Sequence, residues 1–299
     1  MTSDIEVQVQ QYKEQRKNRG CLLVRCPDKP GIIAATSRFL FQYNANIIES
    51  SQYSTNYESG DFFIRIEFEC PSLQDQKEEI KTSFIAIAEN FSMAWKMTFP
   101  SEMKRTAIFV SKELHCIREL LFEWQSGDLM TDIVLVVSNH EHARDLVESF
   151  GIPYVHIPAS RDNRQEVEAQ QLKLLEEYEV DLIVLARYMQ ILTPTFVQAN
   201  PQRIINIHHS FLPAFVGARP YDRAYERGVK LIGATSHYVT NDLDEGPIIE
   251  QDTMRVDHRD NIEAMKKIGR SIERSVLARS VKWHLEDRII LDGNKTIVF

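Results

Sequence analysis

The chain has 299 residues, of which 43% are hydrophobic and 26% are charged, and its formal net charge is -8. This composition is typical of a soluble globular protein with room for two domains, and the acidic balance argues against a nucleic-acid partner. Apolar runs such as 133–137 are five residues long, which is too short to cross a bilayer, so no membrane partner is expected. Four cysteines without a CxxC pair, together with a polar start that has no secretion signal, predict reduced thiols and a cytoplasmic location.

Residues 1–20 are predicted to be a polar tail, and residues 21–100 are predicted to be a small domain. Strand-like alternation and helix-like periodicity follow one another there in the order β-α-β-β-α-β, which is the ferredoxin-like order. The predicted strands are 21–26, 46–54, 62–69 and 93–99, and the predicted helices are 32–43 and 73–90. The first part of the fold prediction is therefore a ferredoxin-like α/β domain.

A turn of Asp28-Lys29-Pro30-Gly31 leads into the first of these helices, and Asn44-Ala45-Asn46 leads into the second strand. With these features the segment resembles an ACT domain, a module that often binds amino acids at the start of its first helix and usually pairs with a second copy. The resemblance implies a homo-oligomer, either a dimer or a tetramer, and an amino-acid effector such as glycine or methionine. The residues expected to contact the effector are Asp28, Gly31, Ile32 and Asn46. A turn that only starts a helix is the alternative interpretation.

Residues 100–104 contain Pro, Ser and charges, and they are predicted to lead into a second domain that spans 104–299. Predicted strands alternate there with helical stretches such as 140–150, and the strands are 106–110, 132–137, 154–157, 181–186 and 203–208. This order is typical of a doubly wound, Rossmann-like α/β fold, whose ligands bind at the carboxyl ends of the strands. A last helix is predicted at 261–285, capped by Asp260 or Asn261, and its role is expected to be packing.

The main site prediction lies at the end of strand 203–208, where Asn206 and His208 are two residues apart. On a strand this spacing places both side chains on one face, so that an amide and an imidazole converge. A long loop, 214–230, leads to a strand at 232–239 that carries His237, and Asp244 follows in a polar turn. An amide, an imidazole and a carboxylate together can polarise a carbonyl and move protons.

Zinc bound by His208, His209 and His237 is a competing interpretation, because three histidines near one loop would suit that metal. Strand alternation argues against it, since the adjacent His208 and His209 should point to opposite faces unless the strand ends between them. The sequence also has no GxGxxG, GxxxxGKS/T, GxSxG or HExxH motif, so the common nucleotide-binding and serine-hydrolase patterns are excluded. No metal site is therefore predicted.

Three motifs in order resemble the folate-dependent formyltransferase family: Asn206-Ile207-His208, the turn Leu243-Asp244-Glu245-Gly246-Pro247, and the segment 185–192. The resemblance implies that Asn206 and a protonated His208 donate hydrogen bonds to the formyl oxygen. Asp244 would keep His208 charged and position or deprotonate the attacking water, with His237 and His209 as support. By the same resemblance no cofactor is needed, and the residues expected to contact the folate substrate are Leu185, Met189, Gln190, Ile191, Leu192, Val239 and Asn241.

The turn after strand 106–110 indicates which acceptor receives the formyl group. Transferases that formylate glycinamide ribonucleotide resemble this domain but have a glycine-rich turn there, which holds the phosphate of their substrate. Residues 111–116 of this chain contain no glycine and include Glu113, so water is left as the acceptor.

An ACT-like domain in front of such a site resembles the formyltetrahydrofolate deformylases, and this resemblance covers almost the whole chain after about residue 20. It implies hydrolysis of 10-formyltetrahydrofolate to tetrahydrofolate and formate, which supplies formate for purine biosynthesis and balances one-carbon pools. Two alternatives remain open. One is a formyltransferase with an unidentified amine acceptor, and the other is an inactive regulatory protein that senses folate or amino acids.

Overall fold

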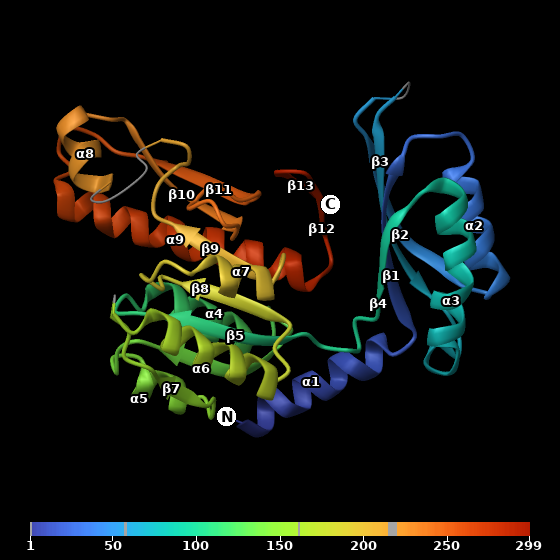
Figure 1. Cartoon of the computed structure of the whole chain (residues 1–299), viewed down its shortest axis with the longest axis horizontal. Helices are drawn as coiled ribbons and strands as arrows, with labels where there is room; N and C mark the ends of the chain where they lie inside the picture. Colours follow the sequence, from blue (N-terminus) through green and yellow to red (C-terminus); the bar gives the residue numbers. More distant parts are fainter. Residues whose placement is uncertain (1, 57–58, 161, 215–219) are drawn as a thin grey trace. The chain divides into compact units, whose positions relative to one another are not determined.

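The computed structural model describes residues 2–56, 59–160, 162–214 and 220–299. The chain divides into two compact units, which we call the front unit, built mainly from Glu6–Met103, and the main unit, built mainly from Lys104–Leu285. Two pieces from the end of the chain, Glu286–Asp292 and Thr296–Phe299, also belong to the front unit, whereas the sequence analysis places them in the second domain. Figure 1 labels the helices and strands.

The front unit has the predicted ferredoxin-like fold. Its elements are β1 (Arg19–Pro27), α2 (Ile32–Gln42), β2 (Asn46–Ser54), β3 (Asp61–Glu69), α3 (Leu73–Phe91) and β4 (Ala94–Thr98). The strand order is β2-β3-β1-β4, and the neighbouring strands are antiparallel. Alternation along β1 and β3 places Leu22, Val24 and Ile64 on one face, where they pack with Phe39 of α2 and Phe84 of α3. The predicted order of elements is confirmed.

The opposite face of this sheet binds the end of the chain. Arg65 of β3 is 7% exposed, and its guanidinium donates to the backbone carbonyls of Glu286 (3.2 Å) and Asp287 (3.0 Å). The Arg25 guanidinium forms an ion pair with Asp292 at 2.7 Å. Charged side chains of the front unit therefore hold the terminal residues, and a pattern of apolar spacing does not reveal such a contact.

The segment expected to be a polar tail forms the helix α1 (Thr2–Arg16). It contains no glycine or proline and is rich in Gln, Glu and Lys, which have high helix propensity. Its few apolar residues do not gather on one side of the helix. A helix is predicted from a sequence mainly by an apolar stripe, so no helix was predicted for this segment.

The main unit is built on a seven-stranded sheet. Its strands are β5 (Arg105–Val110), β6 (Asp132–Ser138), β7 (Tyr154–His156), β8 (Leu182–Ala186), β9 (Ile204–His208), β10 (Leu231–Tyr238) and β11 (Ile248–Arg255), in the order β11-β10-β9-β8-β5-β6-β7. The five strands from β5 to β9 pair in parallel, which confirms the doubly wound prediction. The antiparallel pair β10 and β11 extends the sheet at one edge, and β11 was not predicted.

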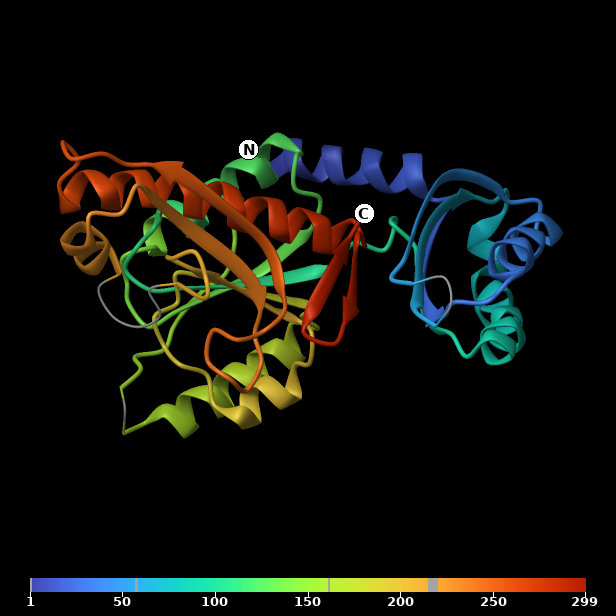
Figure 2. The same ribbon diagram turned by 90° about the horizontal axis from the view of Figure 1, so that it is seen from above.

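Helices cover both faces of this sheet. They are α4 (His115–Ser126), α5 (Arg144–Glu148), α6 (Arg164–Glu177), α7 (Pro194–Ala199), α8 (Pro220–Arg227) and α9 (Ile262–Leu285). Figure 2 shows α9 on one side of the sheet and α6 and α7 on the other. A final pair of short strands, β12 (Ile289–Asp292) and β13 (Lys295–Val298), ends the chain.

Two predictions about the helices need correction. The helix expected at 140–150 is confined to α5, because the carbonyl of His140 accepts a hydrogen bond from the Tyr154 hydroxyl and its N–H donates to the Ser138 hydroxyl at 3.1 Å. The stretch 214–230, expected to be a loop, contains α8, while residues 215–219 lie outside the described residues. The last helix begins as predicted, since the Asn261 side chain accepts the Ala264 N–H at 2.9 Å.

The strand order reverses between β5 and β8, so the carboxyl ends of β5, β8 and β9 meet at one edge of the sheet. In doubly wound folds this edge is where ligands bind. Across the described ranges, the helices are all too short or too polar to span a membrane.

Candidate active site

The predicted amide and imidazole groups meet where β9 lies beside β10. In the antiparallel register, Asn206 is opposite His237 and His208 is opposite Thr235. Asn206 Nδ2 lies 3.2 Å from His237 Nε2. The Nδ1 atom of His237 lies 2.9 Å from the carbonyl oxygen of Tyr238 and must be the donor there. The Asn206 amide has two N–H groups, and only one of them can point at His237 Nε2, which leaves the other for a substrate.

Asp244 joins these side chains as predicted. Its Oδ2 lies 3.2 Å from His208 Nδ1, and its Oδ1 lies 3.7 Å from His237 Nε2. Burial would raise the pKa of Asp244, but hydrogen bonds and charge interactions with His208 and His237 outweigh burial and hold that pKa well below its ordinary value. Asp244 is therefore an anion that can stabilise a positive charge on His208.

The turn that carries Asp244 is fixed by close backbone packing. Asp244 has a φ of 59°, in the left-handed region, where a non-glycine residue is uncommon. A Cβ atom at Gly246 would lie 1.8 Å from the Tyr238 carbonyl oxygen, so only glycine fits there. The Tyr238 N–H also donates to the Pro247 carbonyl at 2.9 Å. The Leu-Asp-Glu-Gly-Pro sequence thus locks the carboxylate against the end of β10.

His208 has one ring nitrogen committed and one available. Its side chain is buried, with Nδ1 directed to Asp244, while Nε2 has no hydrogen-bond partner in the described part of the chain. Buried polar atoms are nearly always paired, so an unpaired one needs an explanation. A substrate oxygen that accepts from this nitrogen would provide it.

His209 lies just beyond the last residue of β9, so strand alternation does not apply to it. Its ring centroid is 5.2 Å from that of His208 and 6.1 Å from that of Tyr221. Burial, with a smaller effect of the Arg187 charge, lowers the pKa of His209 to about 4. His209 is thus a neutral ring packed behind the catalytic candidate His208.

The structure offers little for the zinc interpretation. His237 Nε2 faces Asn206 and Asp244, and His209 packs ring to ring against His208. Across the residues described, the one group of metal-type side chains with donor atoms within 4.8 Å of one another is elsewhere, at His115, Cys116 and Glu273. The Glu273 carboxylate of that group already pairs with Arg187, and burial raises the pKa of the Cys116 thiol, so both features oppose a cation there.

His209→Asn should reduce the acid sensitivity of folding. Because the folded pKa of His209 is about 4 and the ordinary value is 6.5, the unfolded chain binds the extra proton between these pH values. The stabilisation by a neutral His209 is complete above pH 6.5 and is lost as the pH falls toward 4, by up to roughly 3 kcal/mol. Urea unfolding at a series of pH values measures this slope. The exposed His258→Asn is the matched control and should keep the wild-type slope, and a wild-type slope in His209→Asn would contradict the assignment.

The segment expected to bind folate follows β8. Leu185 pairs with Asn206 in the parallel register, and its side chain is buried in the core of the main unit. Met189 and Ile191 are 57% and 53% exposed and remain candidates. Of the other predicted contacts, Leu192 and Val239 pack partly against the core, Gln190 is half-buried and Asn241 is exposed.

The residues expected to bind an effector lie near the start of α2. The Asp28 carboxylate accepts a hydrogen bond from the Ser54 hydroxyl at 2.5 Å. Gly31 precedes α2 with a φ of 97°, which L-residues rarely adopt. The Ile32 side chain is buried in the core of the front unit, whereas Asn46 is exposed at the start of β2. Of the four, Ile32 is therefore the one whose side chain is part of the core.

The buried Glu273 and its partners were not predicted from the sequence. The last helix was expected to be a packing element, yet Glu273 lies on the buried face of α9 with Ile272 and Val276. A carboxylate inside an apolar stripe was the signal that could have identified it, because carboxylates are almost never fully buried unless they are paired.

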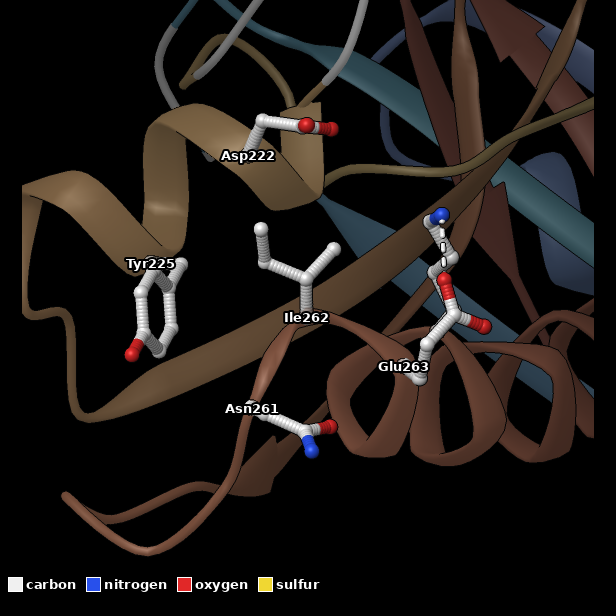
Figure 3. Close-up of a pocket in the computed structure, with 6 residues that line it drawn as sticks. Asp222, Tyr225, Asn261, Ile262 and Glu263 are labelled. Carbon is white, nitrogen blue, oxygen red and sulfur yellow. Dashed lines mark hydrogen bonds and ion pairs between the residues drawn. The ribbon is translucent and has the colours of Figure 1, made fainter.

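A separate cavity of about 420 Å³ lies between α8 and the start of α9. Figure 3 shows Ile262 directed toward α8, between Asp222 and Tyr225, with Asn261 and Glu263 beside it. None of the predicted catalytic or folate-binding residues lines this cavity. It is therefore distinct from the site around His208.

The chain matches two family models in the order that the fold suggests. The model for the ACT domain matches residues 22–82, and the model described as Formyl transferase matches residues 104–281. The main unit also resembles the solved structure of glycinamide ribonucleotide transformylase 1 from Symbiobacterium toebii. That match has 30% identity and a TM-score of 0.63, and it covers 66% of this chain and 94% of the other.

Two relatives that match both units have the same name. The chain is 64% identical over 299 residues to the formyltetrahydrofolate deformylase of Bacillus subtilis, with 100% of both chains covered. It also matches a solved structure of a formyltetrahydrofolate deformylase from Pseudomonas syringae, with a TM-score of 0.90, 47% identity and 94% of each chain covered. On this similarity over its full length, the chain belongs to the formyltetrahydrofolate deformylase family.

Proposed function

We propose that this chain hydrolyses 10-formyltetrahydrofolate to tetrahydrofolate and formate. The observation that carries the proposal is the convergence of Asn206, His208 and Asp244 at the end of β9, with His208 Nε2 buried and unpaired in the described structure. The names of the full-length relatives support the same substrate and reaction.

Two donors serve the formyl oxygen in the proposed mechanism. When water adds to the formyl carbon, the carbonyl oxygen becomes an oxyanion, and hydrogen bonds directed at it lower the barrier. Asn206 Nδ2 supplies one N–H, and His208 Nε2 supplies the other. Both lie on a strand end, so their positions are fixed before the substrate binds.

Asp244 has two tasks in this mechanism. Its carboxylate, 3.2 Å from His208 Nδ1, favours the charged imidazolium that donates from Nε2. Its other oxygen lies toward His237 and can hold the attacking water and accept its proton. The folate nitrogen takes up the proton that Asp244 accepted from the water as its bond to the formyl carbon breaks, and formate leaves.

The turn after β5 supports water as the acceptor. The Ser111 hydroxyl donates to Asn139 Oδ1 at 2.7 Å and accepts from the Met189 N–H at 3.1 Å. His115 of the same turn is bound to Glu273 at 2.8 Å. These groups are engaged with the protein itself rather than directed toward a second substrate.

The proposal is tested by incubating the purified chain with 10-formyltetrahydrofolate alone and measuring formate. Release of formate in step with tetrahydrofolate supports hydrolysis. Turnover that requires an added amine would instead identify a formyltransferase.

Prolonged chelation should leave turnover unchanged, because an amide and an imidazole take the role that a metal would have as a Lewis acid. Turnover is measured before and after chelation, and elemental analysis of the purified protein is the control. Stoichiometric zinc, with activity lost on its removal and restored on its return, would contradict the mechanism and favour a metal site.

We further propose that the front unit binds an amino-acid effector, with glycine and methionine as the candidates, and that it pairs with a second copy of the chain. The match to the ACT domain supports this assignment. The N–H groups at the start of α2 suit a carboxylate, and Asp28 suits the ammonium of the same ligand. The four cysteines are all described and buried, and they form no disulfide with one another, which supports a cytoplasmic location.

Asp28→Ala should weaken the response of turnover to the effector by at least about tenfold in effector concentration, because the ammonium loses its counterion. The response is measured as turnover against glycine or methionine concentration. Ser54→Ala is the matched control, since it removes the same 2.5 Å hydrogen bond and keeps the carboxylate. An unchanged response in Asp28→Ala would leave the front unit as an assembly module.

A further inference from the structure

A buried carboxylate, Glu273 of α9, forms the centre of a charged cluster beside the candidate site. Its side chain is 2% exposed and has partners from three other parts of the chain. Oε2 lies 2.8 Å from His115 Nε2 and 3.4 Å from Arg187 Nε, and Oε1 accepts a hydrogen bond from the Tyr221 hydroxyl at 3.0 Å. We call these four residues the Glu273 cluster. Interactions with His115 and Arg187 outweigh burial and lower the pKa of Glu273, so the carboxylate stays charged.

The cluster lies at the edge of the sheet where this fold receives ligands. His115 is the first residue of α4, which follows β5, and Arg187 is the first residue after β8. The strand order reverses between these two strands, which is the usual binding position of doubly wound proteins. In doubly wound folds, the start of a helix at this position commonly binds an anionic group of a substrate. Here the carboxylate beside the start of α4 is that of Glu273, which belongs to the chain itself.

The chain accommodates the cluster in conformations that are unfavourable in themselves. Arg187 has a φ of 64°, in the left-handed region. On α9, a Cβ atom at Gly269 would lie 1.8 Å from the Tyr221 hydroxyl, so glycine is required for that hydroxyl to reach Glu273. A strained backbone such as that of Arg187 persists only where the surrounding structure enforces it, and it often marks a functional site.

One ring separates the cluster from His208. Tyr221 packs against His209 with centroids 6.1 Å apart, and His209 packs against His208 with centroids 5.2 Å apart. A second organic substrate that approached the formyl group from this side would have to displace charged side chains that are bound to one another. A water molecule needs far less space.

We propose that the Glu273 cluster fills the place of an amine acceptor and thereby restricts the acceptor to water. This inference rests on the proposed hydrolysis. In hydrolysis, the water oxygen bonds to the formyl carbon, the carbon–nitrogen bond to folate breaks, the folate nitrogen gains the proton that the water loses, and formate leaves. In transfer, an amine nitrogen would bond to the same carbon, and the product would be a formamide. The same donors serve both reactions, so the nucleophile that reaches the carbon decides the product.

The test is competition between water and a small amine. Wild-type protein and Arg187→Gly are each given 10-formyltetrahydrofolate and glycinamide, and formate and N-formylglycinamide are measured in the same sample. Glycine suits the backbone at position 187, so this variant removes the guanidinium without adding strain. The ratio of formamide to formate should rise at least about tenfold over the wild-type ratio. Because it is a ratio of products, it does not depend on how much of the protein is folded.

Two further variants make the test decisive. Arg274→Ala removes a neighbouring charge on α9 that pairs with Glu119 at 3.8 Å, outside the cluster, and it should keep the wild-type ratio. Glu273→Gln keeps the volume of the side chain but removes the charge that holds Arg187, so Arg187 can leave the place that it fills, and the ratio should rise here too. Wild-type ratios in both cluster variants would overturn the inference, as would folded variants that make neither product. Wild-type protein that releases no formate would contradict the proposed hydrolysis instead.

Discussion

Asp244→Asn should lower the turnover of 10-formyltetrahydrofolate by about two to three orders of magnitude and leave folate binding nearly unchanged. The amide has the same volume as the carboxylate but neither stabilises an imidazolium at His208 nor accepts a proton from water. The carboxylate lies 3.2 Å from His208 Nδ1, and its pKa is held low by the two histidines, so its charge is part of the arrangement that the variant removes.

Turnover and folate binding should be measured on the same Asp244→Asn preparation, by formate release and by titration. Asp242→Asn is the matched control, because Asp242 is exposed in the same turn and its side chain has no assigned role. If Asp244→Asn kept more than about a tenth of wild-type turnover, the barrier would have risen by less than roughly 1.4 kcal/mol, and the role given to Asp244 would be wrong.

Gly246→Ala should reduce turnover by about a hundredfold, although residue 246 touches no substrate in the proposed mechanism. The added Cβ would lie 1.8 Å from the Tyr238 carbonyl oxygen, so the backbone of the turn must move. That oxygen also accepts from His237 Nδ1, and Asp244 lies two residues before the glycine, so two members of the site move together. A displacement of about one ångström is enough for this loss of rate.

Gly228→Ala is the matched control for Gly246→Ala. Gly228 also has a positive φ, of 66°, but a Cβ there meets nothing within 4 Å. This variant should cost about 1 kcal/mol of stability with turnover retained. Equal turnover in Gly246→Ala and Gly228→Ala would contradict the view that packing of this turn places Asp244.

The predictions that the structure confirmed depend on short-range patterns. The alternation in 21–100 identified the β-α-β-β-α-β order, and the alternating strands and helices after residue 104 identified the doubly wound sheet. The spacing of Asn206 and His208 was informative for the same reason, because two residues of a strand share a face without help from the rest of the fold. That Asp244 lies near these two residues was predicted from the family motif that contains it, because no local pattern says where a turn lies relative to a strand.

Contacts between distant parts of the chain were not predictable in this way. The Glu273 cluster joins four segments, and the partners of Glu273 lie 52 to 158 residues away. Arg65 binds residues that follow it by 221 and 222 positions. Such contacts depend on tertiary packing. In the sequence, only the charged Glu273 on an apolar helix face indicated one of them.

Leu185 shows what a sequence motif leaves open. The motif 185–192 was interpreted as a ligand-binding segment throughout, but its first residue still belongs to β8 and is buried in the core of the sheet. The end of the strand decides which side chains of this segment are exposed. Met189 and Ile191 lie beyond that point.

The claim that water is the nucleophile is tested most directly by turnover in water labelled with the heavy isotope of oxygen. The purified chain is given 10-formyltetrahydrofolate without any amine, and the formate is analysed by mass spectrometry. Hydrolysis through Asn206, His208 and Asp244 predicts one labelled oxygen in each formate and one tetrahydrofolate for each formate released. Formate without the label, or a formyl group that leaves folate only when an amine is added, would contradict the account.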